Sequence, residues 1–162
     1  MFNMLDIYNT ENKFSSTEFE LAIFGHDYVY NVGAPDNEEQ SAKIIINWIG
    51  KRFFKTDKYF TNLLLTTKHG NQITTTDDEK LLTDLDLSIL GTFDEATWKK
   101  YCQGIREEYA IYSDEEFDKG RVEFFKNLLN RDRIFQTDFF YNLFEKQARQ
   151  NIKRWILALD FY

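Results

Sequence analysis

The stretch Phe24-Gly25-His26-Asp27 decides how this sequence is interpreted, because it places a histidine and an aspartate at the end of an apolar run that begins at Phe19. Aspartate is among the residues least often buried without a partner, and histidine is only an intermediate core residue. Burying either group unpaired costs several kcal/mol, so both need something to bind. Two explanations are open. The pair caps the helix end and hydrogen-bonds locally, or it binds a divalent metal ion, which imidazole and carboxylate together suit.

Working outward from this stretch, the composition predicts a helical fold. Hydrophobic residues make up 43% of the 162 positions and aromatic residues 17%, too much apolar material for a disordered chain. One proline and seven glycines leave few helix breakers. Strand-like alternation is weak, and the length fits one domain with a substantial core. We therefore expect an all-α, single-domain helical bundle that covers residues 1–162.

The charge and the cysteine content narrow the classes of partner and compartment. The formal net charge of −7 predicts that the surface repels duplex nucleic acid, so a small anionic substrate needs local cations or a metal. Cys102 is the only cysteine, which excludes an internal disulfide and fits a reducing cytosol. We find no signal peptide and no apolar run of about 18 residues, and so expect a cytoplasmic protein without a membrane partner.

Helical periodicity and capping signals divide most of the chain into segments. Ser15 and Glu18 stand at capping-box spacing and predict a helix start, and residues 31–35 predict its end because they include glycine and proline. A second helix is predicted to open at residues 36–39. Further helices are expected over residues 60–65 up to a stop at Gly70, after residues 74–78, and over residues 94–112, 114–129 and 138–159. Residues 1–12 carry no clear signal, so an N-terminal helix is expected to be short or incomplete.

Two more aspartates, Asp84 and Asp86, lie among leucines and isoleucines in residues 81–90. If this helix is buried, the two aspartates are poorly explained as residues of a solvent-exposed helix face. We expect Asp84 to face solvent, and we expect Asp86 to point inward and act together with His26 and Asp27.

Several segments of the sequence resemble those of a known family. The segment AIFGHDYVY at residues 22–30 and the segment DLDLSILG at residues 84–91 are similar to those of the HD-domain superfamily of metal-dependent phosphohydrolases, in a branch of small and mostly uncharacterised bacterial proteins. The likeness continues, in order along the chain, through Asp36-Asn37-Glu38, Ser41-Ala42, Thr66-Thr67-Lys68-His69, and residues 105–109, 120–121 and 131–137. It covers the chain from about residue 19 onward. The series is specific for the family and much less specific for a substrate.

The resemblance implies a helical domain in which four side chains bind a divalent metal ion. His26, Asp27 and Asp86 match three of these ligands, whereas the family's first ligand, a histidine ahead of the His-Asp pair, has no counterpart. Asp6, in a segment that faintly resembles the upstream motif, would substitute for it as an oxygen ligand. The alternatives are that the chain begins late or that the site is degenerate. The metal is left open among Mn, Fe, Mg, Zn, Ni and Co.

The resemblance also assigns chemical roles. The metal would lower the pKa of a bound water, and Asp27 would accept its proton. Glu38 would orient that water or bind a second metal, or it is an ordinary acidic residue at a helix N-terminus. His69 would donate a proton to the leaving oxygen, or it interacts with a helix C-terminus.

Three cations, Lys68, Arg106 and Arg121, are candidates to bind the phosphate of the substrate. Each is equally explained by pairing with a nearby acid, and the acids close in sequence are Glu107, Glu108, Asp118 and Glu123. The leading hypothesis is a phosphohydrolase, a phosphomonoesterase or phosphodiesterase, that acts on a small phosphoester such as a nucleotide. The competing hypotheses are a degenerate, non-catalytic HD domain that binds a nucleotide or a protein, and a purely structural helical protein. The many aromatic residues are compatible with a homodimer face.

Overall fold

The computed structural model describes residues 1–12, 14, 16–54, 56–68 and 74–159, and over these residues every regular element is a helix. The predicted all-α class is confirmed. The chain divides into two compact units, Met1–Asp86 and Leu87–Tyr162, which are called the first and the second unit below. The single domain expected from the sequence stays a prediction. Among the described helices, none combines the length and the apolar character needed to cross a membrane.

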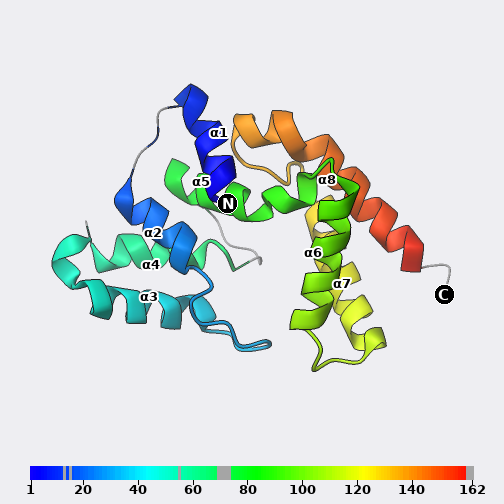
Figure 1. Cartoon of the computed structure of the whole chain (residues 1–162), viewed down its shortest axis with the longest axis horizontal. Coiled ribbons are helices and arrows are strands. Elements are labelled where there is room, and N and C mark those ends of the chain that lie inside the picture. The colour runs from blue at the N-terminus through cyan, green and yellow to red at the C-terminus, as the bar shows by residue number, and fades with distance from the viewer. Residues whose placement is uncertain (13, 15, 55, 69–73, 160–162) are drawn as a thin grey trace. The chain divides into compact units, whose positions relative to one another are not determined.

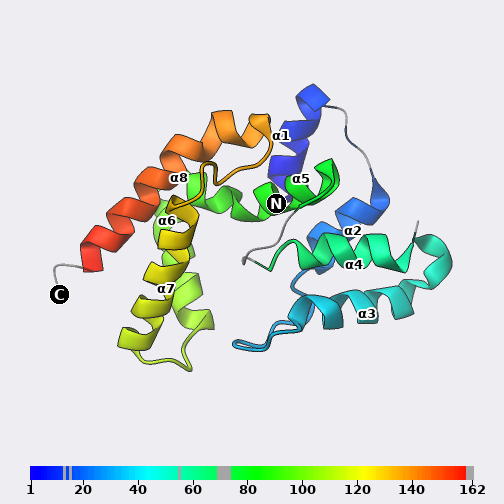
Figure 2. The same cartoon turned by 180° about the vertical axis from the view of Figure 1, so that it is seen from behind.

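The first unit is built from five α-helices and one 3₁₀ turn: α1 (Phe2–Asn12), α2 (Thr17–Gly25), α3 (Asn37–Ile49), η1 (Lys51–Phe53), α4 (Asp57–Leu65) and α5 (Asp77–Leu87, whose last residue opens the second unit). Helices α2, α3 and α4 pack together, and α3 and α4 lie side by side in Figure 1 and Figure 2. Their core contains the buried side chains of Phe19, Ala22, Phe60, Leu63 and Leu64. Burial of these apolar faces supplies the main driving force for the unit.

Helix α2 begins one residue later than predicted and ends much earlier. Ser16 is its N-cap and accepts a hydrogen bond from the Phe19 N–H, while Ser15 lies outside the described residues. The helix ends at Gly25 and not at residues 31–35, so the predicted end is wrong. A Cβ at Gly25 would overlap Ile45 Cδ1, which shows that the helix end lies directly against α3. This close approach is a contact between two helices, and the hydrophobic periodicity of one helix cannot predict it.

Two further helix starts in the first unit differ in their capping. Asp36 precedes α3 as expected but makes no side-chain capping hydrogen bond. Thr76 and Glu79 exchange hydrogen bonds at the start of α5, through Glu79 N–H to Thr76 Oγ1 and Thr76 N–H to Glu79 Oε2, as in a capping box. The predicted stop at Gly70 lies outside the described residues. The N-terminal helix, expected to be short or incomplete, extends over eleven residues as α1, and Leu5 is its buried residue.

The second unit contains η2 (Ser88–Gly91), α6 (Glu95–Glu108), α7 (Asp114–Leu129) and α8 (Asp138–Leu159). Helix α8 packs on η2 and α7. Asn151 donates to the carbonyls of Leu90 and Thr92, both at 2.9 Å, and Gly91 lies so close to Phe144 that a Cβ would overlap its ring and Cβ. The predicted bounds of α7 and α8 are confirmed, including the capping box of Ser113 and Glu116.

Helix α6 ends at Glu108, four residues before the predicted end. The guanidinium of Arg106 donates to the carbonyls of Tyr109 and Tyr112 and to the carboxylate of Asp114. These hydrogen bonds fix a turn between α6 and α7. Continuation of the helix would place those carbonyls in intrahelical bonds instead.

The loop between α7 and α8 is held by the ion pair of Glu145, which is buried, and Arg149, which is partly buried. Glu145 accepts hydrogen bonds from the backbone N–H groups of Ile134 and Phe135, and its Oε1 lies 2.7 Å from Arg149 Nε. Arg149 in turn donates to the carbonyls of Leu129, Arg131 and Asp132. Buried charges need this degree of pairing, and here the partners are mostly backbone groups.

Candidate functional site

The end of α2 and the end of α5 bring His26, Asp27 and Asp86 together within the first unit. His26 is the C-cap residue of α2 and keeps a helical backbone conformation. Its Nδ1 lies 3.0 Å from the Ile23 carbonyl, so the opposite nitrogen, Nε2, faces the carboxylates. Nε2 lies 3.2 Å from Asp27 Oδ2 and 3.5 Å from Asp86 Oδ1. Side chains from two segments far apart in the sequence therefore meet at one imidazole nitrogen.

The electrostatics of this cluster are dominated by its carboxylates. Burial lowers the pKa of His26, but the hydrogen bonds and charges of Asp27 and Asp86 outweigh burial and raise the pKa to about 10. The imidazole is 13% exposed, Asp86 is 19% exposed and Asp27 is 59% exposed. The cluster thus has a covered side, formed by His26 and Asp86, and an open side at Asp27.

The donor set suits a divalent metal ion in its chemistry and in its pairwise distances. Two ligands at right angles, each about 2.1 Å from an ion, are about 3.0 Å apart, close to the separations from Nε2 to the two carboxylates. The bond from Nδ1 to a backbone carbonyl is the arrangement that orients ligating histidines. Within the described part of the chain, no three such groups already surround a common metal position. The residues fit an ion if Nε2 gives up its proton and the two carboxylates turn toward it.

The other predicted residues of the first unit are placed differently. Asp6 is exposed on α1. Lys68 Nζ lies 2.6 Å from Glu39 Oε1, 2.7 Å from the Pro35 carbonyl oxygen and 3.7 Å from Glu38 Oε2. Lys68 therefore holds the N-terminal end of α3, and Glu38 belongs to the same ion-pair cluster. His69 lies outside the described residues.

The two predicted arginines belong to the second unit. Arg106 pairs with Asp114, an acid that the sequence analysis did not name. Arg121 donates to the hydroxyl of Tyr101, and its guanidinium lies over the rings of Phe124 and Phe125, 4.8 and 4.6 Å from their centroids. Both guanidinium groups have well-defined partners within their own unit.

Asp84 is fully buried, so the expectation that it faces solvent is wrong. Helix α5 buries the whole run from Leu81 to Leu85, which leaves no solvent face at that turn. Together with burial and the charges of Asp77 and Asp78, the Asp84 charge raises the pKa of Tyr8 on α1. A signal was present in the sequence: Asp84 follows Leu81 by three positions, the spacing of one helix face.

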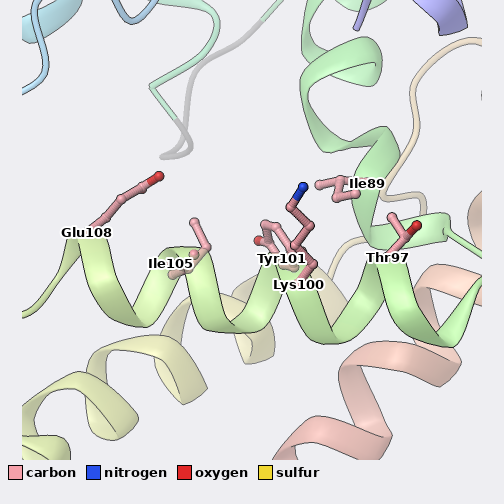
Figure 3. Close-up of a pocket in the computed structure, with 7 residues that line it drawn as sticks. Ile89, Thr97, Lys100, Tyr101, Ile105 and Glu108 are labelled. Carbon is pink, nitrogen blue, oxygen red and sulfur yellow. The ribbon is translucent and has the colours of Figure 1, made fainter.

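The second unit has a surface hollow that the sequence analysis did not predict. Figure 3 shows it along one face of α6, with Lys100, Ile105 and Glu108 directed to the same side and Ile89 contributed by η2. Its volume is about 300 Å³, and it is completed by Thr97, Tyr101 and Gly104. The lining is mainly apolar, and it contains none of the described residues that were proposed above for chemistry.

Comparison with known proteins finds no matching family model, no matching curated protein and no matching solved structure. The HD-domain resemblance therefore rests on the residues given in the sequence analysis. It stays a prediction.

Proposed function

We propose that this protein is a metal-dependent phosphohydrolase of the HD-domain type, which hydrolyses a small phosphoester such as a nucleotide. The observation that supports the proposal is the meeting of the His26 imidazole with the carboxylates of Asp27 and Asp86. Adjacent His and Asp side chains have many local uses. A second aspartate from a distant helix at the same nitrogen is harder to explain by capping.

The side chains of the cluster have separable tasks in this proposal. His26 and Asp86, on the covered side, would hold the ion, and the Ile23 carbonyl would keep the imidazole in the orientation that presents Nε2. A bound divalent ion supplies Lewis acidity and an acidified water. Asp27, whose side chain is 59% exposed, is the group that substrate and water can reach, and it would accept the proton of the attacking water.

A second function is favoured by one feature of the same cluster. Both nitrogens of His26 already lie within contact distance of acceptors from the chain itself, namely Ile23, Asp27 and Asp86. A degenerate HD domain that binds a nucleotide or a protein without turnover would keep such a network as a local ion-pair cluster. The two functions differ in metal dependence and in turnover.

Hydrolysis assays on the whole chain separate them. The substrates are p-nitrophenyl phosphate, bis-p-nitrophenyl phosphate and a panel of nucleoside monophosphates, each with Mg²⁺, Mn²⁺, Co²⁺, Ni²⁺ and Zn²⁺. We expect metal-dependent turnover that His26→Ala and Asp27→Ala abolish, with the helical circular dichroism retained. Asp94→Asn, a change at the exposed N-cap of α6, is the control that should keep turnover. Hydrolysis that persists in both site variants would refute the proposal, and nucleotide binding without turnover would favour the non-catalytic function.

A further inference from the structure

The loop that follows Asp27 is attached to α3 by two side chains that each bind a backbone segment. The Val29 N–H donates to Ser41 Oγ at 2.9 Å, and Ser41 Oγ lies 3.4 Å from the Val29 carbonyl oxygen. The Asn31 N–H donates to Asn37 Oδ1 at 3.0 Å, and Asn37 Nδ2 donates to the Asn31 carbonyl at 3.0 Å. Each side chain therefore binds the N–H and the C=O of one loop residue, as a neighbouring strand would.

Both side chains are buried, Asn37 with 8% and Ser41 with 0% of its surface exposed. They stand four positions apart, on one face of α3. Ile45 is the next residue on that face, and it is the residue against which Gly25 packs. One stripe of α3, formed by residues 37, 41 and 45, thus contacts loop residues 31 and 29 and the last residue of α2, Gly25, in that order.

This stripe fixes the chain on both sides of His26 and Asp27. Gly25 precedes the pair and lies against Ile45, whereas Val29 follows it and is bound by Ser41. The Tyr28 N–H donates to the Gly25 carbonyl at 3.1 Å and closes the turn between these two points. The backbone that carries Asp27 is therefore held, although its side chain is the exposed member of the cluster.

We propose that Asn37 and Ser41 are positioning residues for the candidate site: by binding Val29 and Asn31 they place the Asp27 carboxylate at the His26 nitrogen that also faces Asp86. This inference rests on the proposed function, in which the placed carboxylate contributes to a metal site. Deleting the Ser41 hydroxyl removes the partner of the partly buried Val29 N–H and C=O, and such groups move to reach water. A displacement of about 1 Å at a ligand is enough to lower the performance of a site by a large factor.

Cobalt titration of the whole chain distinguishes positioning from simple stabilisation. Ser41→Ala and Asn37→Ala are compared with Ile46→Val, which shortens a buried side chain of the same helix and leaves both attachments intact. For each variant the melting temperature, the Co²⁺ affinity and the visible Co²⁺ absorption bands are measured. We expect Ser41→Ala and Asn37→Ala to weaken Co²⁺ binding about tenfold or more, as loss of outer-shell partners does, and to change the absorption bands. Ile46→Val should lower the melting temperature and leave affinity and bands unchanged.

Two results would overturn the proposal. One is wild-type Co²⁺ affinity and spectrum in Ser41→Ala. The other is an equal loss of affinity in Ile46→Val at a similar loss of stability, which would assign the effect to stability alone.

If the wild-type chain binds no Co²⁺, the proposed function fails, and the placement is then tested without metal. Amide hydrogen exchange should be faster by tenfold or more at Tyr28, Val29 and Asn31 in Ser41→Ala, and unchanged there in Ile46→Val. Unchanged protection of these amides in Ser41→Ala would overturn the placement itself.

Discussion

Each of the two units holds a cluster of charged side chains, and the two clusters differ in the partners that their charges bind. In the second unit, Glu145 and Arg149 bind each other and five backbone groups, one at the end of α7 and four in the loop that precedes α8. In the first unit, His26 meets two carboxylates, and one of these, on Asp27, is open to solvent. In the cluster of the first unit the charged side chains mainly contact one another. In the cluster of the second unit they mainly bind backbone groups.

This difference separates a structural cluster from a candidate functional one. A charge that is satisfied by N–H and C=O groups of its own loop cannot exchange those partners without unfolding the loop. An imidazole held between two carboxylates can exchange a proton for a metal ion while the backbone stays in place. The following predictions test this contrast, beginning with the largest effect.

The first prediction concerns the titration of His26 in chelator-treated protein. With a pKa near 10 in place of 6.5, the imidazole binds its proton about a thousandfold more tightly or better. Because the folded-state pKa is raised, this contribution to stability is fully present below pH 6.5 and is lost as the pH rises toward 10. Nuclear magnetic resonance of the His26 ring, assigned with His26→Gln, should show a charged imidazole throughout neutral pH. Titration near pH 6.5 would contradict the described cluster.

The second prediction concerns the ion pair of Glu145 and Arg149 in the second unit. Glu145→Ala removes the partner of Arg149 and leaves the N–H groups of Ile134 and Phe135 unpaired, so we expect a loss of about 3–5 kcal/mol in the free energy of unfolding. Urea denaturation measures it. Glu145→Gln, which keeps an acceptor of nearly the same shape, should lose less. A loss below about 1 kcal/mol in Glu145→Ala would show that the pair does not hold the loop.

The third prediction compares a glycine from each unit. Gly91→Ala should cost more than Gly25→Ala, because its new Cβ meets the Cβ and ring of Phe144, whereas the Cβ at residue 25 meets the terminal methyl of Ile45. Overpacking of this kind costs about 1–3 kcal/mol. Ile45→Val removes the overlapping methyl and should restore much of the stability of Gly25→Ala. Equal losses at the two glycines, or no rescue by Ile45→Val, would argue against the described packing.

The smallest expected effect concerns two helix caps. Ser113 accepts from the Glu116 N–H while Glu116 accepts from the Ser113 N–H, whereas Ser16 makes one hydrogen bond, of 3.3 Å, to the Phe19 N–H. Ser113→Ala should therefore lower the melting temperature by a few degrees, and Ser16→Ala by less. Differential scanning calorimetry of the two variants checks this order. A larger loss in Ser16→Ala would reverse it.

The parts of the fold that were predictable from sequence are those with local causes. The capping box at Ser113 and a long amphipathic pattern define α7, and both are readable from neighbouring residues. The sequence did not predict the end of α2 at Gly25, where the chain lies against Ile45, because a contact with a residue distant in sequence leaves no local pattern. For α1 the sequence predicts only a short or incomplete helix, because Leu5 is its one buried residue and gives little periodic signal.

The residues of the candidate site likewise divide into those that the sequence pattern indicates and those that depend on tertiary contacts. His26, Asp27 and Asp86 were chosen because their charges lie in apolar segments, and the structure brings them together, while their role as ligands stays a prediction. For Asn37 and Ser41 the sequence offers only the resemblance. Their attachment to Val29 and Asn31 depends on how the loop returns along α3, which no local pattern encodes.

The most direct test of the account is metal binding by the whole chain. Elemental analysis after purification without chelator, followed by Mn²⁺ and Co²⁺ titration by calorimetry, is carried out on the wild-type chain, His26→Ala, Asp86→Ala and the control Asp94→Asn. We expect divalent metal binding near one equivalent in the wild type and the control, and its loss in both site variants. Absence of binding in the wild type, or equal binding in His26→Ala and Asp86→Ala, would contradict it.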